Sequence, residues 1–404
     1  MPNNSARGKI VVLAAVGPAI TWYDMDVETC TLSPRQVSQA PQNVQYIWPG
    51  LAGSNLFYIA SSSQGPRREA PGGEHWLSVY LADAATATLI AHGEPAQLPH
   101  RPVHLTIDAT GSFALVAYPR PAAATVHRIN ADGTVGTEAG AEVKQSSSLD
   151  PGIFPHQVRM LPSNRGAILV TRGNDATRDT PEDPGALKVL DMNDGVLTNR
   201  QSAAPGGGYG FGPRHIDIDA TGRWVYASLE RQNQLAVFSL RDDRLSADPV
   251  YVRNTLKDPD AKQPDSTHQL TSTVHVHPSK NVVYVANRAS GVAQPGGGRA
   301  VFEGGDNSIA VFAINPQTGE PTLIQNEDTR GIHPRTFAID PSGRMMVVAH
   351  IQAINVREGA TTREQPASLT TFRVGSDGKL QFVNQYDVKT DGQSQFWMGM
   401  VAIN

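Results

Sequence analysis

The chain has 404 residues, of which 34 are basic and 38 acidic, so its formal net charge is −4 at neutral pH. This balance gives no electrostatic basis for a nucleic-acid partner or for binding to an anionic membrane surface. The single cysteine, Cys30, excludes an internal disulfide and any zinc or iron–sulfur site built from several cysteines. Hydrophobic residues make up 39% of the chain, enough for a sizeable core, and no run of 18 apolar residues predicts a transmembrane helix.

The first residues, 1–8, are expected to form a flexible tail. Arg7 and Lys9 precede an apolar stretch, Ile10 to Val16, which resembles a short signal peptide. We interpret this stretch instead as a β-strand, because it leads into a strand pattern that recurs along the chain. Without a signal, and with one cysteine only, the protein is expected to be cytoplasmic.

A short pattern of alternating apolar residues recurs seven times and predicts strands. Its copies are TWYDMD (21–26), SVYLAD (78–83), TVHRIN (125–130), KVLDMN (188–193), AVFSLR (236–241), AVFAIN (310–315) and TTFRVG (370–375). A polar turn follows most copies, as at 131–133 and 376–378, which is typical of a strand that enters a tight hairpin.

A second pattern, in which a turn joins two apolar strands, precedes each of the last six copies. Its clear examples are 215–228, 274–287 and 336–349, and its weaker ones are 46–60, 105–117 and 158–171. Divided among seven units, the chain gives about 58 residues to each, which four short strands and three turns would fill. Amphipathic helical periodicity of useful length is absent.

These repeats predict a single all-β domain, a seven-bladed β-propeller with four-stranded antiparallel blades. The first copy, at 21–26, has no strand pair of its own before it. We expect the C-terminal segment FWMGMVAIN, 396–404, to complete that blade together with the N-terminal strands. The ring would then be closed and would leave no unpaired sheet edge between its ends.

The expected binding face is the one that carries the long connections. These follow the second strand of a blade, at 64–76, 172–186, 289–306 and 352–366, whereas the turns on the opposite face have four residues, as in Asp219–Gly222. Long loops on one face and tight turns on the other predict a ligand site at the loop-rich mouth of the channel.

Histidine and arginine gather at this mouth. The residues that enter the innermost strands or follow the second strands are His104, His156, Arg172, Arg214, His215, Glu230, Arg288 and Arg335. Arginine offers paired donors to a carboxylate or phosphate, and His156 or Glu230 could move a proton. Polar side chains also line propeller channels merely for hydration, so each of these residues has a structural alternative. We interpret His275 and His277 as structural, with His277 in the turn position that Asp219 holds elsewhere.

Three segments, 212–230, 272–288 and 333–349, resemble the lactonase-type seven-bladed propeller family. That family includes propeller 6-phosphogluconolactonases and fungal 3-carboxy-cis,cis-muconate lactonising enzymes. The segments 154–162 and 102–111 match its blade-opening motifs as well. The likeness is clear over about residues 95–350 and weak at both ends.

The resemblance implies that His156, Arg214, Glu230 and Arg288 carry out lactone chemistry, without a metal or a cofactor. We also expect His104, Arg172, His215, Arg335 and His350 to bind the substrate. Two features depart from the family pattern. Ala349-His350-Ile351 stands where the family usually has Ala-Asn-Gln, and the connection 172–186 is acidic, with Asp175, Asp179, Glu182 and Asp183.

The leading hypothesis is hydrolysis of an anionic lactone, sugar-type or muconate-type, by a monomer or a weak homo-oligomer. Glu230 or His156 would activate water, and Arg214 or Arg288 would stabilise the oxyanion. One alternative is a cycloisomerase that closes a muconate-like diacid into a lactone. Another is a propeller that only binds ligands or proteins, since fold alone does not establish activity. A calcium-dependent lactonase fits less well, because the mouth is richer in Arg and His than in acidic oxygens.

Overall fold

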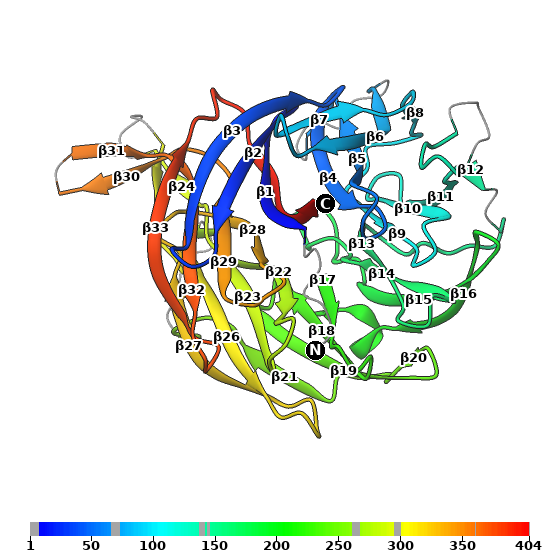
Figure 1. The fold of residues 1–404 in the computed structure, drawn as a ribbon. Coiled ribbons are helices and arrows are strands. Elements are labelled where there is room, and N and C mark those ends of the chain that lie inside the picture. The colour runs from blue at the N-terminus through cyan, green and yellow to red at the C-terminus, as the bar shows by residue number, and fades with distance from the viewer. Residues whose placement is uncertain are drawn as a thin grey trace, which may run out of the picture.

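The computed structural model describes residues 8–65, 73–136, 142–143, 146–260, 267–294, 300–359 and 361–403. The tail expected at residues 1–8 lies outside this part of the chain, except for Gly8. The described residues form seven antiparallel sheets arranged as a ring (Figure 1), together with two small hairpins and one 3₁₀ turn, Pro205–Gly208. The prediction of an all-β seven-bladed propeller is confirmed.

The strands of each blade are given from the innermost outward. Blade 1 has β4 (Asn43–Pro49), β5 (Leu56–Ser62), β6 (His75–Asp83) and β7 (Thr88–Ala91), with β8 (Ala96–Gln97) also on β6. Blade 2 has β9 (His104–Ile107), β10 (Phe113–Tyr118), β11 (Ala123–Arg128) and β12 (Glu142–Val143). Blade 3 has β13 (Pro155–Met160), β14 (Gly166–Thr171), β15 (Ala186–Asn193) and β16 (Val196–Ala203).

Blade 4 has β17 (Pro213–Ile218), β18 (Trp224–Leu229) and β19 (Gln234–Arg241), with β20 (Arg244–Leu245) and β21 (Tyr251–Asn254) on β19. Blade 5 has β22 (Leu270–Val276), β23 (Val282–Arg288), β26 (Ser308–Ile314) and β27 (Pro321–Asp328). Blade 6 has β28 (Pro334–Ile339), β29 (Met345–His350), β32 (Ala367–Val374) and β33 (Leu380–Val388). Blade 7 has β34 (Gln395–Ile403), β1 (Lys9–Val16), β2 (Ala19–Asp26) and β3 (Thr31–Gln39).

The ring closes where the two ends of the chain meet in blade 7. The C-terminal strand β34 is its innermost strand and pairs antiparallel with β1, so that Leu13 lies opposite Gly399. Trp397 of β34 then packs in the same core cluster as Trp22 of β2 and Phe57 of blade 1. The predicted closure and the interpretation of Ile10–Val16 as a strand are both confirmed.

The core lies between the blades, because each sheet is covered on both faces. In β14, Ala167 and Leu169 pack toward blade 2, whereas Ile168 and Val170 pack toward blade 4. Every residue of this strand is therefore buried. A strand covered on both faces is expected to be apolar along its length, and β14 is apolar except for Thr171, whose hydroxyl donates to Ala186 O.

Several tight turns opposite the mouth are built around an acid, which is buried at Asp108 and Asp340. Asp340 accepts backbone N–H groups of Ser342 and Arg344 at 2.8 Å and of Met345 at 2.6 Å. Asp108 and Asp219 do the same in blades 2 and 4. In blade 5 the position belongs to His277, whose Nδ1 accepts from Ser279 and Lys280. The interpretation of His277 as a structural turn residue is confirmed.

Replacing Asp340 with alanine should lower the free energy of unfolding by about 2–4 kcal/mol, because three backbone N–H groups lose a charged acceptor. Urea denaturation measures this change. Asp377→Ala is the matched control, since Asp377 is exposed and accepts one backbone N–H in another turn of the same blade. Equal losses in the two variants would contradict a special role for the buried acid.

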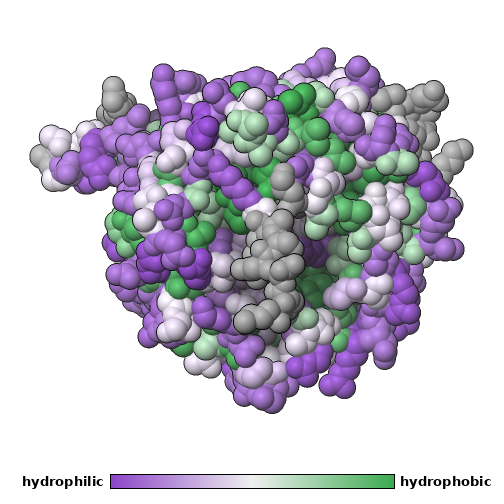
Figure 2. Space-filling view, in the orientation of Figure 1, coloured by the Kyte–Doolittle hydropathy of each residue, from purple (hydrophilic) through white to green (hydrophobic). Residues whose placement is uncertain are grey.

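Two of the long connections contain hairpins of their own. Strands β24 (Val292–Ala293) and β25 (Val301–Phe302) form one, and β30 (Ile354–Glu358) and β31 (Thr361–Gln365) form the other, which projects from the ring (Figure 1). Asn355 Nδ2 donates to Ala300 O at 3.1 Å and so links them. Figure 2 shows that the outer edge of the ring is mainly hydrophilic, with apolar residues in patches nearer its middle. Among the described residues, no helix is long and apolar enough to cross a membrane.

Candidate functional site

Six innermost strands carry an extra residue near the point where they begin. In β22 the register shift leaves Ser272 and Thr273 opposite Ala286. In the other five it leaves one residue without a partner on the neighbouring strand, and these residues are Gln45, His156, Arg214, Arg335 and Phe396. Such a β-bulge bends the strand and re-aims the side chain of the extra residue. In blades 3, 4 and 6 a proline precedes the bulge, where its missing N–H costs no hydrogen bond of the sheet. The bulges direct these side chains to the mouth.

The residues that follow the second strands reach the same place. The N–H of Arg172 donates to Phe154 O at 3.0 Å, and that of Glu230 donates to Gly212 O at 2.8 Å, so the two residues hold equivalent positions. Ile351 has this position in blade 6, since its N–H approaches His333 O at 3.3 Å.

His350 therefore comes one residue too early to reach the mouth surface. It pairs with Pro334 as Leu229 pairs with Pro213, and its side chain is fully buried. Its Nδ1 lies 2.9 Å from Ser368 Oγ, and burial lowers its pKa to about 4. Its Nε2 is buried and has no hydrogen-bond partner among the described residues, and the expected contact of His350 with substrate stays a prediction.

Glu230 lies at the centre of the site and joins three arginines from three blades. Its Oε2 is 2.6 Å from Arg172 Nη1, and its Oε1 is 3.0 Å from Arg214 Nε. Arg288 Nη2 donates to Oε1 as well. Only 2% of the Glu230 surface is exposed, and Arg214 and Arg288 are buried with it, whereas Arg172 is partly exposed.

These contacts determine the charges of the site. Burial by itself raises the pKa of Glu230, but Arg288, Arg172 and Arg214 outweigh it and lower the pKa to about 2. Burial and the charge of Arg288 lower the pKa of Arg214 to about 9, which still leaves it cationic at neutral pH. Glu230 is thus a permanent anion and a weak base, held among permanent cations.

Three histidines continue the site into the channel. The ring of His156 lies 5.2 Å from that of His215, which lies 6.2 Å from His104. Burial, followed by the charge of Arg214, lowers the pKa of His156 and His215 well below the usual range, so both are neutral imidazoles. The buried Nδ1 of His156 has no hydrogen-bond partner among the described residues. His104 is fully buried against Tyr46, with ring centroids 4.0 Å apart, and lies beneath the mouth.

Two further residues at the mouth, Phe154 and His333, escaped the sequence analysis. His333 Nε2 lies 3.0 Å from Arg288 Nη1, and the guanidinium of Arg172 lies 4.3 Å from the centre of the Phe154 ring. Both residues have φ near +60°, which is uncommon for a side chain other than glycine. Each directly precedes the proline of a blade-opening motif. Their position before this proline could have identified both as residues of the mouth from the sequence.

The acidic connection 172–186 is tied to the site through Arg231. Arg231 Nη2 is 2.8 Å from Glu182 Oε1, and Nη1 is 3.0 Å from Asp175 Oδ1. Glu182 also accepts the N–H of Gly210 at 2.9 Å. Two consecutive residues of blade 4 therefore bind this loop: Glu230 pairs with Arg172 at its start, and Arg231 pairs with its acidic residues.

Replacing Arg231 with glutamine should raise KM about three- to tenfold and change kcat less, because the loop that positions Arg172 loses its cation while Glu230 keeps Arg214 and Arg288. Steady-state kinetics with the best lactone substrate measures both constants. Arg253→Gln is the control, since Arg253 pairs with Glu320 on the outer strands. An unchanged KM in Arg231→Gln would show that the loop holds its position without this pair.

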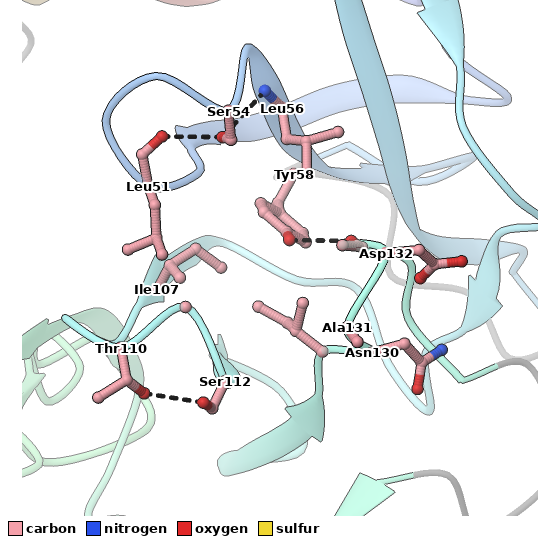
Figure 3. Close-up of a pocket in the computed structure, with 13 residues that line it drawn as sticks. Leu51, Ser54, Leu56, Tyr58, Ile107, Thr110, Ser112, Asn130, Ala131 and Asp132 are labelled. Carbon is pink, nitrogen blue, oxygen red and sulfur yellow. Dashed lines mark hydrogen bonds between the residues drawn. The ribbon is translucent and has the colours of Figure 1, made fainter.

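A different hollow lies away from the mouth, between blades 1 and 2. It has a volume of about 330 Å³ and is lined by turns that include Leu51, Thr110 and Asn130 (Figure 3). Its polar groups bond to one another, as when Tyr58 Oη donates to Gly133 O at 2.9 Å. Nothing in this lining concentrates charge or leaves a buried group aimed at a ligand.

Acidic oxygens of the described residues do not converge in the channel. Asp217 accepts the N–H of Val276 at 2.9 Å and is 3.1 Å from Arg159 Nη2, and His275 Nδ1 lies 3.6 Å away. These contacts tie together the innermost strands of blades 3, 4 and 5. Within the described ranges, no group of three or more His, Cys, Asp or Glu side chains is placed to hold a metal ion.

The structure is a seven-bladed propeller whose mouth gathers arginines around one buried carboxylate. Residues 13–365 match the family model described as "Lactonase, 7-bladed beta-propeller". The chain therefore belongs to this lactonase family.

Named relatives and solved structures agree with the family. The chain is 23% identical over 340 residues to a 6-phosphogluconolactonase of Bacillus subtilis, covering 83% of this chain and 84% of that one. It is 24% identical over 319 residues to a 6-phosphogluconolactonase of Pectobacterium atrosepticum, covering 76% and 77%. Its fold matches a putative 6-phosphogluconolactonase of Bacteroides fragilis (TM-score 0.69, 16% identity, 100% of both chains). It also matches the periplasmic gluconolactonase of Pseudomonas aeruginosa (TM-score 0.69, 18% identity, 98% and 99%).

Proposed function

We propose that this protein hydrolyses a lactone that carries a negative charge, and that the reaction takes place at the arginine-rich mouth. The observation that carries the proposal is the buried Glu230 carboxylate, which holds three guanidiniums beside the neutral imidazole of His156. Membership of the lactonase family supports it, as do relatives named 6-phosphogluconolactonase. No metal or cofactor is needed for the steps that follow.

His156 is the proposed base. Its neutral imidazole accepts a proton from water, and the hydroxide oxygen attacks the carbonyl carbon of the lactone. Arg214 and Arg288 stabilise the oxyanion that forms. The bond from this carbon to the ring oxygen then breaks, the imidazolium returns its proton to that oxygen, and a hydroxy acid is released.

Glu230 has a different role in this proposal. Its carboxylate is committed to three guanidiniums and its pKa is about 2, so it accepts a proton poorly at neutral pH. It serves instead to hold Arg214 and Arg288 in position. The proposal therefore assigns the base to His156 rather than to Glu230.

The charge of the site favours an anionic substrate. Arg172, Arg214, Arg288 and Arg335 bring four positive charges, and Glu230 compensates only one of them. A carboxylate or phosphate on the lactone would offset part of the excess. A cytoplasmic location, which the lone cysteine supports, and a monomeric or weakly associated state belong to the same proposal.

The test is proton release in weak buffer with sugar lactones, phosphorylated sugar lactones and muconolactones, with and without a chelator. We expect chelator-resistant turnover of an anionic lactone. Loss of diene absorbance with muconates, without lactone hydrolysis, would replace the proposal by ring closure. If no compound is turned over, the proposal would be replaced by that of a propeller that only binds ligands or proteins.

A further inference from the structure

Arg335 differs from the other three arginines of the mouth. Arg172, Arg214 and Arg288 all pair with Glu230, whereas Arg335 has no ion pair within the described part of the chain. Its Nη1 and Nη2 have no hydrogen-bond partner there either, and the residue is half-buried rather than closed off. An uncommitted guanidinium in a site with excess positive charge is available to bind an anionic ligand.

The orientation of this guanidinium is nevertheless fixed. Arg335 Nε donates to Phe396 O at 3.1 Å, and the guanidinium carbon lies 3.6 Å from the centre of the Phe396 ring. Thr273 Oγ1 donates to Arg335 O at 3.0 Å and so holds the bulged backbone. With Nε engaged and one face stacked, the edge formed by Nη1 and Nη2 remains for a ligand. That edge matches two oxygens of a carboxylate or phosphate.

We infer that Arg335, stacked on Phe396, binds the anionic group of the substrate that takes no part in bond breaking. The inference rests on the proposed lactone hydrolysis and adds the position of the second anion. The oxyanion forms beside Arg214 and Arg288, and the carboxylate or phosphate lies on Arg335 in blade 6. A phosphate dianion together with the developing oxyanion matches the three uncompensated charges, so phosphorylated lactones are expected to be preferred over neutral ones.

The experiment compares Arg335→Gln and wild type on three lactones: a phosphorylated sugar lactone, a carboxylated lactone and neutral gluconolactone. With the preferred anionic lactone, kcat/KM should fall about 100-fold, mostly through KM, because a charge-assisted bidentate contact is lost. With gluconolactone it should change less than about threefold. Arg335→Lys should recover part of the loss, since a point charge replaces the planar pair of donors. The anionic lactone with the larger loss identifies the group bound as phosphate or carboxylate.

Arg330→Gln is the matched control. The guanidinium carbon of Arg330 also lies over a phenylalanine ring, 5.3 Å from the centre of Phe382, and its replacement by glutamine removes the same charge. Unlike Arg335, Arg330 pairs with a carboxylate, that of Glu327 on an outer strand. It should leave kcat/KM unchanged with all three lactones. Equal losses with neutral and anionic lactones in Arg335→Gln, or no loss with either, would overturn the inference.

Failure of the lactonase proposal can be told apart from failure of this inference. If wild-type protein hydrolyses no lactone, calorimetric titration with 6-phosphogluconate, the acid that the phosphorylated lactone would yield, still tests the subsite. Binding that is lost in Arg335→Gln and kept in Arg330→Gln would support Arg335 as an anion site. Equal binding by all three proteins, or no binding by wild type, would overturn it.

Discussion

Replacing Glu230 with glutamine should remove most of the activity and lower the free energy of unfolding by about 3–5 kcal/mol. Glutamine keeps the shape of the side chain but cannot compensate Arg172, Arg214 and Arg288, which would then repel one another, with Arg214 and Arg288 buried. We expect kcat to fall at least about 100-fold, because the arginines that stabilise the oxyanion lose their common support. Urea denaturation and steady-state kinetics measure the two effects.

Glu327→Gln is the control for this change. Glu327 is half-buried on the outer strand β27, where burial raises its pKa, and its neighbouring cation Arg330 is exposed. The control should therefore stay near wild type in both measurements. A Glu230→Gln variant with wild-type stability would show that the three arginines are neutralised in another way.

The same carboxylate makes stability depend on pH. The pKa of Glu230 is about 2 in the folded protein, below its ordinary value of 4.5, so the charged form stabilises the fold. This contribution is complete above pH 4.5 and is lost as the pH falls from 4.5 toward 2. The difference in unfolding free energy between wild type and Glu230→Gln should therefore be constant near neutral pH and shrink in that acidic range.

Much of the fold could be predicted because each blade repeats the same apolar pattern. The repeat also explains how the central contacts form, since Arg172, Glu230 and Arg288 follow one another at intervals of 58 residues. Residues one repeat apart occupy matching places in adjacent blades. That spacing is close to the average of one seventh of the chain, so the meeting of these three side chains was within reach of sequence analysis.

The direction in which each side chain points could not be predicted from the apolar repeat. The apolar pattern does not show that the strand shifts register between Pro155 and Gln157, and that shift is what turns His156 toward the mouth. The same limit explains His350, which was expected to bind substrate but lies one residue earlier in blade 6 than Glu230 does in blade 4. His333 was missed because its position depends on a left-handed backbone before Pro334. These details come from backbone geometry at the strand ends, where alternation of apolar residues carries no information.

The proposed base gives the second large effect. Replacing His156 with asparagine should lower kcat about 10²- to 10⁴-fold and change KM little, because the loss of a proton acceptor affects the transition state more than binding. His127→Asn is the control, since His127 is a buried histidine with a pKa of about 4 on the outer part of blade 2, away from the mouth. Comparable losses of kcat in both variants would point to damage to the fold rather than to lost catalysis.

The pH dependence of the reaction separates His156 from a merely structural residue. Burial and the cations Arg214, Arg172 and Arg335 lower the pKa of His156 in the free enzyme, so the acid limb of kcat/KM should lie well below pH 6.5. A bound anionic substrate offsets part of that positive charge and raises the pKa of the imidazole. The acid limb of kcat should therefore lie at a higher pH than that of kcat/KM, with a smaller separation for neutral gluconolactone. In His156→Asn, the acid limbs of both kcat and kcat/KM should disappear from the residual activity. An acid limb that survives at the same pH would assign the proton transfer to another group.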